Sequence, residues 1–347
     1  MRVLFLTPWY PSKKDEMSGL FVQKHVEAVR AQGVEVRVIF SESWRDTWRQ
    51  WKALRREGWM PDVVQLNVIQ KQGILALWLK KRYGIPYVIV EHWSGFLPEN
   101  GAYLRNNGSL KRKIYEKIAS EASVIMPVSE RLKEAMQTCG IQNARWEKIH
   151  NVVDDFFFEK EESRKSKVES QKTLLHVSCF DEAAKNVKGL LRAAKMLTEK
   201  RQDWCLVLVG TGADYKEVRA YAATLAFPAG TLRWTGELTP REVAEEMHKA
   251  DAFVLPSNYE NAPVVLSESL AMGLPIIASR VGGIPEMVDE ESGILVPTRD
   301  EKALAEAMDE MLDNLDKYDS EKIRLQGEQY SFETVGKHFK AVYESVL

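Results

Sequence analysis

The chain has 347 residues, of which 45% are hydrophobic and 28% charged, enough for two domains with separate buried cores. Its three cysteines (Cys139, Cys179 and Cys205) share no CxxC spacing, which argues for a reducing compartment and against a disulfide framework or a zinc site. The N-terminal apolar run is broken at Pro8 and nowhere do eighteen apolar residues run together, so we expect a soluble, cytoplasmic protein.

The net charge of −2 is unevenly distributed along the chain. Residues 1–157 carry 24 Lys and Arg against 17 Asp and Glu, whereas residues 158–347 carry 24 against 33. A basic half joined to an acidic half suggests that the first half meets an anionic partner. The alternative is that these charges belong to solvated helix faces.

The first half alternates strands with helices, a rhythm typical of a parallel sheet with helices on both faces. We expect strands at 2–7, 34–40, 63–66, 87–91, 124–128 and 146–150, and helices at 20–31, 73–83, near 110–119 and at 130–139. The loop 8–19 separates the first strand from the first helix.

The segment 158–172 is charged and almost lacks large apolar residues, so it reads as a linker or surface loop. The rhythm then restarts, which predicts an α/β protein with domains at 1–165 and 166–330 and a final helix, 331–347, that packs back on the first domain. Strands are expected at 174–178, 205–209, 231–234, 252–255 and 294–296, and helices at 188–199, 214–225, 240–249, 300–315 and 332–347.

The stretch 255–286 contains two acids, Glu260 and Glu268, that we expect to meet at one ligand-binding crevice. On one continuous helix, Glu260 and Glu268 would not share a face, but Pro263 fits a first helical turn and not a helix interior. Glu260 is therefore expected on a loop after the strand 252–255, and Glu268 in the second turn of a helix that starts near Pro263. Strand end, helix start and both carboxylates would converge where open α/β sheets bind ligands.

An ordered set of motifs surrounds these acids. Glu260-x7-Glu268 is followed by AMGLP (271–275), GGIPE (282–286) and GILVP (293–297), and the set resembles the donor-binding half of retaining GT-B glycosyltransferases of family 4. The resemblance spans most of the chain, through the segments 10–29, 91–96 (EHWSGF), 128–130 (VSE), 151–158 (NVVDDFFF), 209–212 (VGTG) and 253–257 (FVLPS).

The resemblance implies two Rossmann-like domains that face a central cleft, and a retaining hexosyltransferase. Such an enzyme moves a sugar from a UDP- or GDP-sugar to a hydroxyl on a sugar or lipid-linked saccharide, in polysaccharide or glycoconjugate synthesis. The leaving diphosphate needs a metal or fixed positive charge. The chain contains no Asp-x-Asp, so we expect no metal and no cofactor, with the charge supplied by a helix start near Pro263 and by Lys185.

The resemblance also assigns roles to single residues of the second domain. Lys185 matches the lysine that grips the diphosphate, Glu268 would accept hydrogen bonds from the ribose, and Glu260 would position the transferred sugar. Glu268 could instead serve only as a helix-dipole partner. Cys179 stands where the family usually has an arginine, with Lys188 or Arg280 as possible substitutes. The other expected donor-binding residues are Gly210, Gly212, Asn261, Ala262, Pro263 and Val264, and the Gly282–Gly283 turn would meet donor sugar or phosphate.

Two residues of the first domain complete the expected site. Gly19 would let a loop backbone approach the diphosphate, although Ser18 replaces a second glycine that is common there. His92 follows the strand 87–91, and by resemblance it contacts the transferred sugar as a catalytic residue. Its alternative is a loop-fixing hydrogen bond. Glu91 is a weaker candidate.

The segment 44–56 (WRDTWRQWKALRR) reads as an amphipathic helix. Trp44, Trp48 and Trp51 recur on one helical face beside a basic stripe, which suits peripheral contact with the inner face of a membrane or an anionic lipid-linked acceptor. The alternative, which we favour slightly, is that the tryptophans pack on the first sheet. Nucleic acid is not an expected partner, because the pI is 6.4 and no recognition motif is present.

Two other functions compete with glycosyl transfer. One is a different GT-B enzyme, such as a nucleotide-sugar epimerase or a phosphorylase. The other is a non-catalytic nucleotide-sugar-binding protein, which Cys179 in place of arginine would favour. The sequence leaves the base, the sugar and the acceptor undetermined.

Overall fold

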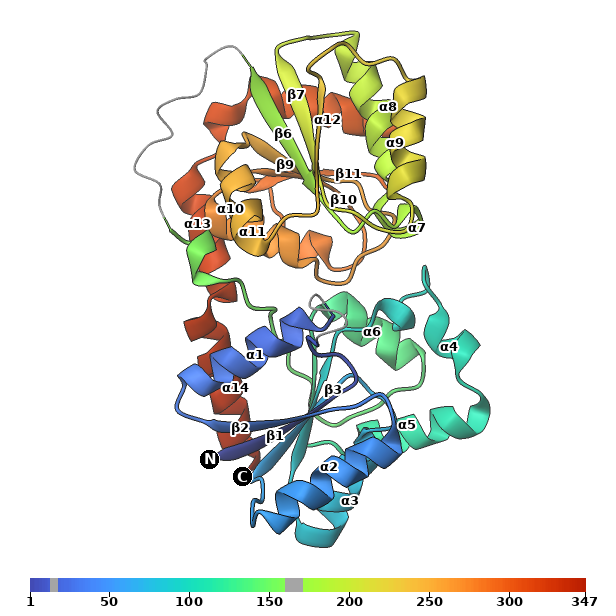
Figure 1. Cartoon of the computed structure of the whole chain (residues 1–347), viewed down its shortest axis with the longest axis vertical. Coiled ribbons are helices and arrows are strands. Elements are labelled where there is room, and N and C mark those ends of the chain that lie inside the picture. Colours follow the sequence, from blue (N-terminus) through green and yellow to red (C-terminus); the bar gives the residue numbers. More distant parts are fainter. Residues whose placement is uncertain (13–17, 160–170) are drawn as a thin grey trace. The chain divides into compact units, whose positions relative to one another are not determined.

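The computed structural model describes residues 1–12, 18–159 and 171–347. The chain divides into two compact units, residues 1–152 with 330–347 and residues 153–329, and each is built around one parallel sheet covered by helices (Figure 1). The α/β class predicted from the strand–helix rhythm is therefore confirmed. The expected domain boundary at 165/166, most of the expected linker 158–172 and part of the loop 8–19 lie outside the described residues.

The first unit has the strand order β2-β1-β3-β4-β5, with all neighbours parallel. Because parallel crossovers are right-handed, this order places α1 on one face and α2, α3 and α5 on the other. The last helix, α14, returns to this unit and packs against α1 (Figure 1). The strands are β1 (Arg2–Thr7), β2 (Glu35–Phe40), β3 (Val63–Asn67), β4 (Tyr87–Glu91) and β5 (Val124–Pro127); the helices are α1 (Leu20–Ala31), α2 (Trp44–Arg56), α3 (Gly73–Tyr83), α4 (Ala102–Asn106), α5 (Ser109–Glu121), α6 (Glu130–Thr138) and α14 (Phe332–Val346).

The second unit has the strand order β11-β10-β9-β6-β7-β8. Its core fills the space between the sheet and helices α8 and α12, and the fully buried Trp204 is its largest side chain. The strands are β6 (Lys172–Val177), β7 (Trp204–Val209), β8 (Leu232–Gly236), β9 (Ala252–Leu255), β10 (Ile276–Ser279) and β11 (Gly293–Val296); the helices are α7 (Glu182–Lys185), α8 (Val187–Thr198), α9 (Tyr215–Thr224), α10 (Pro240–Lys249), α11 (Val264–Met272), α12 (Glu301–Asp313) and α13 (Ser320–Gly327).

The expected strand at 146–150 is wrong. This segment runs along β5 and exchanges backbone hydrogen bonds with it, but only Trp146 forms a bridge, opposite Ile125. Apolar alternation in the segment reflects burial of Ile149 beside the sheet rather than a sixth strand. Three short helices, α4, α7 and α13, are present that were not expected from the sequence. Within the described residues, no helix combines the length and the apolar character needed to cross a bilayer.

Candidate functional site

The second unit brings Lys185 and Glu260 together at the point where its strand order reverses. After β6 the chain proceeds to β7 on one side, whereas after β9 it proceeds to β10 on the other. The carboxyl ends of β6 and β9 therefore border a crevice, the usual ligand position in an open α/β sheet. Lys185 ends the short helix α7 that follows β6, and Glu260 lies on the loop that follows β9.

Lys185 and Glu260 form an ion pair. The Lys185 ammonium donates a hydrogen bond to Oε1 of Glu260, and the Ser257 hydroxyl donates to the same oxygen at 2.8 Å. The side chains of Lys185 and Glu260 are only 17% and 10% exposed. Burial alone would lower the pKa of Lys185, but the adjacent carboxylate outweighs burial and the pKa is raised. Lys185 is thus a fixed cation at the switch point.

Helix α11 begins at Val264, directly after Pro263, as the sequence predicts. Pro263 has extended backbone angles (φ −67°, ψ 120°), so the helix cannot extend back to Glu260. Glu268 lies in the second turn and is 8% exposed, whereas Asn261 and Ala262 belong to the preceding loop. The two acids are therefore carried by different elements, and the N-terminal end of α11 supplies a partial positive charge near them.

A glycine turn packs against the backbone that carries Glu260. Gly282 has a φ of 54°, and a Cβ at this position would lie 1.7 Å from the carbonyl oxygen of Glu260. The next residue, Gly283, donates its N–H to the carbonyl of Asn261 at 3.0 Å. Any larger residue at 282 would displace the acid-bearing loop, so this glycine fixes the position of Glu260.

Gly210 and Gly212 approach the chain's own backbone closely. A Cβ on Gly210 would lie 1.9 Å from the Ser178 carbonyl oxygen, and one on Gly212 would lie 1.9 Å from that of Cys179. Both glycines therefore allow the loop after β7 to press against the loop after β6. This contact accounts for both residues by backbone packing and leaves their expected role in donor binding as a proposal.

His176 anchors the loop after β6, and sequence reasoning missed it. Its Nδ1 hydrogen-bonds the Val254 carbonyl and its Nε2 hydrogen-bonds the Ser178 hydroxyl, both at 2.8 Å. Because the carbonyl can only accept, Nδ1 carries the proton and Nε2 accepts from Ser178. Burial lowers the pKa of His176 to about 4, so the ring is neutral at neutral pH. A polar residue inside an otherwise apolar strand was the available signal.

Cys179 is exposed, and Lys188, one of its proposed substitutes, is engaged elsewhere. The Lys188 ammonium forms an ion pair with Glu217 on α9. Arg280, the other candidate, has an exposed side chain after β10. Arg299 is a further cation, and its Nε donates to Oδ1 of Asn258 at 3.1 Å.

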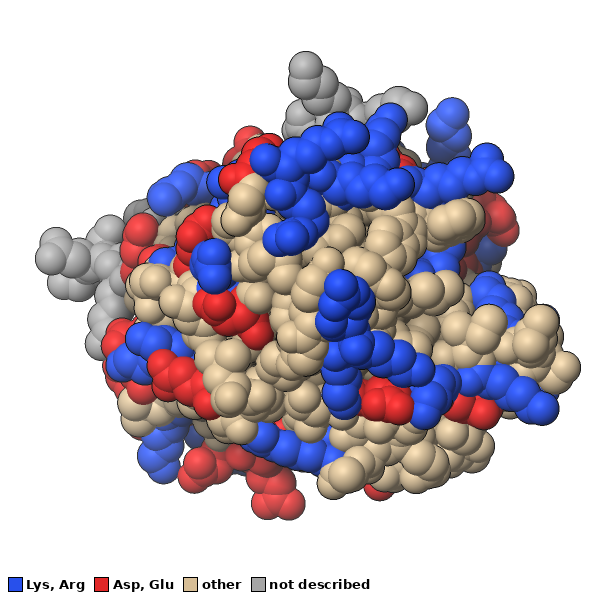
Figure 2. Space-filling view, turned by 90° about the horizontal axis from the view of Figure 1, so that it is seen from below, with Lys and Arg blue, Asp and Glu red and all other residues tan. Residues whose placement is uncertain are grey.

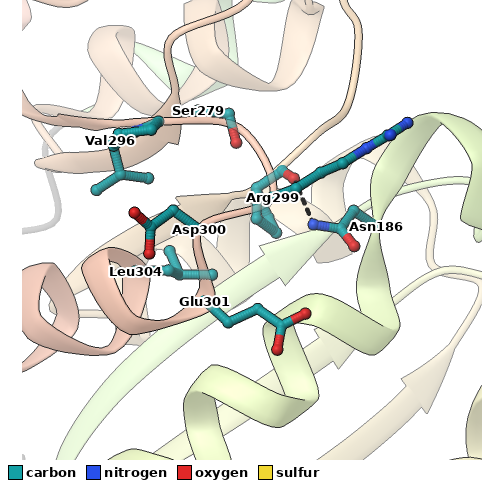
Figure 3. A pocket seen from close by; sticks show the side chains of 9 residues that line it. Asn186, Ser279, Val296, Arg299, Asp300, Glu301 and Leu304 are labelled. Carbon is teal, nitrogen blue, oxygen red and sulfur yellow. Dashed lines mark hydrogen bonds between the residues drawn. The ribbon is translucent and has the colours of Figure 1, made fainter.

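A small hollow, partly open to solvent, lies at the carboxyl ends of β9, β10 and β11 (Figure 3). Arg299 and Asn186, the residue that follows Lys185, line it, and the side chain of Arg299 extends past Asn186 (Figure 3). Asn186 adopts a left-handed backbone (φ 51°), and its amide donates to the Pro256 carbonyl at 3.3 Å. These contacts tie the end of α7, and hence Lys185, to the loop after β9.

In the first unit, Gly19 caps the start of α1. Its φ is 71°, and a Cβ there would lie 2.3 Å from the carbonyl carbon of Trp9. The close approach that this glycine permits is therefore to the loop after β1, and its expected contact with a diphosphate remains a proposal.

His92 directly follows β4 and is enclosed by aromatic rings. Its ring centroid lies 4.5 Å from that of Phe21 and 5.3 Å from that of His25, both on α1. Burial and the neighbouring His25 hold the pKa of His92 well below its usual value, against a hydrogen bond with Asn151 that favours the charged form. His92 is thus a neutral hydrogen-bonding group rather than a cation at neutral pH.

Glu91 holds the backbone around His92. This fully buried carboxylate accepts hydrogen bonds from the N–H groups of His92 (3.0 Å), Trp93 (2.9 Å) and Ile69 (2.9 Å). Burial raises its pKa to about 7, although these three bonds lower it. Glu91 thereby links the loops after β3 and β4, and its role is to position the peptide of His92.

The second unit contains the positive charge and the hydrogen-bond acceptors that are needed to bind and release a phosphorylated leaving group. A fixed ammonium and a helix start can stabilise a developing negative charge, while two carboxylates can accept hydroxyl hydrogen bonds. In the described ranges, which leave out 13–17 and 160–170, no group of three or more His, Cys, Asp or Glu side chains is placed to hold a metal ion.

Comparison with known proteins places both halves of the chain in related families. Residues 1–155 match the model of "Glycosyltransferase Family 4", and residues 157–325 match that of "Glycosyl transferases group 1". The chain is 28% identical over 237 residues to N-acetyl-alpha-D-glucosaminyl L-malate synthase of Bacillus anthracis, which covers 65% of this chain and 61% of that protein.

A second relative, TuaC of Bacillus subtilis (strain 168), is described provisionally as a teichuronic acid biosynthesis glycosyltransferase. It is 22% identical over 368 residues, 89% of this chain and 88% of its own. Among solved structures, Anabaena HepE in complex with UDP and glucose has a TM-score of 0.77 at 16% identity, and the match covers 99% of this chain and all of that chain. The two sheets, the two family models and these likenesses agree, and the chain belongs to the group 1 glycosyltransferases of the GT-B fold.

Proposed function

We propose that the protein transfers a hexosyl group from a nucleoside diphosphate sugar, UDP- or GDP-linked, to a hydroxyl acceptor. The observation that carries the proposal is the buried Lys185–Glu260 pair at the switch point of the second sheet, next to the start of α11. HepE, which shares the fold, was solved with UDP and glucose, and this supports a nucleotide-linked donor.

In the proposed reaction, the diphosphate leaves with its charge stabilised by the Lys185 ammonium and the α11 N–H groups. Glu268 accepts hydrogen bonds from the ribose, and Glu260 orients the sugar and offsets positive charge at its anomeric carbon. His92, neutral and held by Glu91, contributes hydrogen bonding to the transferred sugar. The proposed outcome is retention of the anomeric configuration, without a metal or cofactor.

We further propose that the acceptor is a sugar or lipid-linked saccharide used in polysaccharide or glycoconjugate synthesis. TuaC, named for teichuronic acid biosynthesis, supports this class of product. A lipid-linked acceptor would bring the protein to the inner face of the membrane, with peripheral contact through α2. The excess of Lys and Arg in the first half of the chain is the supporting observation.

The proposal is tested by incubating the protein with UDP- and GDP-sugars and a panel of acceptors, with EDTA present. Release of free nucleotide together with a glycosylated acceptor is expected. An epimerised sugar without nucleotide release would instead indicate an epimerase, and nucleotide binding without turnover on any acceptor would indicate a binding protein. The Glu260→Gln variant serves as the control, because it keeps the shape of the site and should lose turnover.

A further inference from the structure

The tryptophans of α2 divide into two packing residues and one exposed residue. Trp51 is 2% exposed, and the ring of Trp48 contacts that of Trp78 on α3 edge-on, with centroids 5.0 Å apart. Trp44 alone is largely exposed, at 54%. A tryptophan stripe lying in a bilayer is therefore not what α2 offers, because Trp51 is buried and Trp48 packs against α3.

The stripe of α2 that adjoins the tryptophans is basic and faces solvent. Arg45, Arg49, Lys52 and Arg56 recur at helical spacing and are all exposed. Asp46 is the only acid of the helix, and it pairs with Arg49. Since Trp48 and Trp51 are already packed, the surface that α2 presents to a partner consists of this basic stripe and the exposed Trp44.

Helices α3 and α5 extend this surface beside α2. Arg55 of α2 lies over the ring of Tyr83 at the end of α3, at 5.7 Å, and Lys80 of α3 pairs with Glu121 of α5 at 3.5 Å. The three helices therefore form one continuous layer on one face of the first sheet. We call this layer, formed by α2 (Trp44–Arg56), α3 (Gly73–Tyr83) and α5 (Ser109–Glu121), the three-helix face.

The three-helix face concentrates positive charge. Its helices, 13, 11 and 13 residues long, carry twelve Lys and Arg against three Asp and Glu, a net charge of +9 in a chain whose net charge is −2. Figure 2 views the molecule from this end, and Lys and Arg side chains gather there with uncharged surface between them. Such a segregated charge attracts polyanions or anionic surfaces.

Exposed apolar side chains lie among these charges. Nine large hydrophobic residues are exposed in the described chain, and five of them belong to the three-helix face, among which Leu110 is 74% exposed. Leu110 and Ile114 share one stripe of α5 with Lys113 and Lys117, because these positions recur at helical spacing. The remaining three of the five are Trp44, Ile74 and Tyr83.

The combination of basic and exposed apolar side chains on the three-helix face favours one of two kinds of anionic partner, a polyanion or a lipid bilayer. Nucleic acid or an acidic polymer offers phosphates or carboxylates to the basic residues but nothing to exposed aliphatic side chains such as Leu110. An anionic bilayer offers lipid headgroups to the basic residues and an acyl boundary to the apolar ones. We propose that the three-helix face docks the protein on an anionic lipid bilayer, with basic residues on the headgroups and the apolar side chains inserted between them.

This docking surface enlarges the α2 contact proposed above and replaces its tryptophan anchor with residues from three helices. Each Lys or Arg near an anionic membrane is worth about 1 kcal/mol, which is about fivefold in the partition coefficient. Because the residues are exposed, salt screens their attraction within about 10 Å at about 0.1 M. Binding should therefore depend on anionic lipid and weaken with salt.

The test is co-sedimentation of the full chain with vesicles of phosphatidylcholine alone and with vesicles that also contain phosphatidylglycerol. Binding only to the anionic vesicles is expected. Substituting Arg45, Arg49, Lys52 and Arg56 together with Gln should lower the partition coefficient at least about tenfold, since two contributions of about fivefold each already multiply to more than that. A matched control substitutes four exposed basic residues of the second unit, Lys216, Arg241, Lys302 and Lys322, with Gln, and should bind as the parent protein does.

A second variant tests the apolar component. Leu110→Asn with Ile114→Asn should remove the binding that persists at about 0.5 M salt, where charges are screened. Equal binding to neutral and anionic vesicles, or equal loss in the α2 variant and its control, would overturn the proposal. So would binding to heparin without binding to vesicles. No donor is present in these measurements, so their failure would leave the proposed transferase activity untouched.

Discussion

Replacing Lys185 by methionine removes one partner of a buried ion pair. The Glu260 carboxylate would keep only the hydrogen bond from Ser257, at 2.8 Å, in a position where its side chain is 10% exposed. Breaking a fully buried pair costs about 3–5 kcal/mol. Because Lys185 is 17% exposed and Ser257 remains, we expect about 2–3 kcal/mol for Lys185→Met.

This loss is measurable as thermal stability. In a unit of this size each 1 kcal/mol lowers Tm by about 2–4 °C, so Lys185→Met should melt about 5–10 °C below the parent protein. Glu260→Gln should also lower the stability of the protein, because it leaves the buried Lys185 ammonium without its carboxylate partner. The double variant should be about 2 kcal/mol more stable than the sum of the single effects predicts, because the two residues are in direct contact.

Nucleotide affinity separates the roles of the pair. Lys185→Met should weaken UDP or GDP binding by about 10–100-fold, the range expected for a lost charge-assisted hydrogen bond. Glu260→Gln frees the ammonium from its carboxylate, so nucleotide affinity should stay equal or rise while turnover falls. Titration calorimetry and scanning calorimetry give these quantities. Nucleotide affinity unchanged by Lys185→Met would show that Lys185 does not bind the diphosphate, and strictly additive stabilities in the double variant would show that Lys185 and Glu260 do not stabilise each other.

Four further predictions address the rest of the site. Glu268→Ala should weaken nucleotide binding about 10–100-fold by calorimetry and leave turnover at saturating donor less affected, and the opposite pattern would remove Glu268 from the ribose. Gly282→Ala should abolish turnover, because its Cβ would lie 1.7 Å from the Glu260 carbonyl; an active variant would show that this loop can shift. EDTA should leave turnover intact, and a loss restored by added metal would contradict the metal-free proposal. Between pH 6.5 and 4 the free energy of unfolding should fall by about 3 kcal/mol through His176 alone, since the unfolded ring takes up a proton near pH 6.5 and the folded ring only near pH 4. In urea titrations, His176→Asn should flatten this slope, and an unchanged slope would assign it to other groups.

The alternating α/β pattern was readable because buried parallel strands are continuous apolar runs and helices between them are amphipathic. The start of α11 was predictable for a local reason, the conformational restriction of Pro263. The segment 146–150 was expected to be a strand because burial of Ile149 produces the same apolar pattern. It does donate backbone hydrogen bonds to β5, from Glu147 and Ile149, but only Trp146 forms a bridge, and the sequence does not show how far such pairing continues.

The two acids of the site could be predicted from the sequence, but the residues that hold them in place could not. Glu260, Glu268 and Lys185 belong to an extended motif. Their side chains indicate what they can do, because carboxylates accept hydrogen bonds and an ammonium group stabilises negative charge. The direct contact between Lys185 and Glu260 joins positions 75 residues apart, and only the sheet order brings them together. His176 was missed because a single buried histidine in a strand does not reveal its partners.

Glycines show a similar limit. Their presence at 210, 212 and 282 was read as access for a ligand, whereas each closely approaches another loop of the same unit. A glycine in such a motif indicates that another group lies too close for a side chain, but it does not indicate whether that group is a ligand or the protein's own backbone. The contact partner follows only from the arrangement of β6, β7, β9 and β10.

The most direct test of the central claim is proton NMR of one reaction that contains the protein, an α-linked UDP- or GDP-sugar and a hydroxyl acceptor. We expect nucleoside diphosphate and glycosylated acceptor to appear in equal amounts, and the new linkage to give an α-anomeric signal. A β-linked product would contradict retention. Loss of donor with neither free nucleotide nor glycosylated acceptor would contradict glycosyl transfer itself.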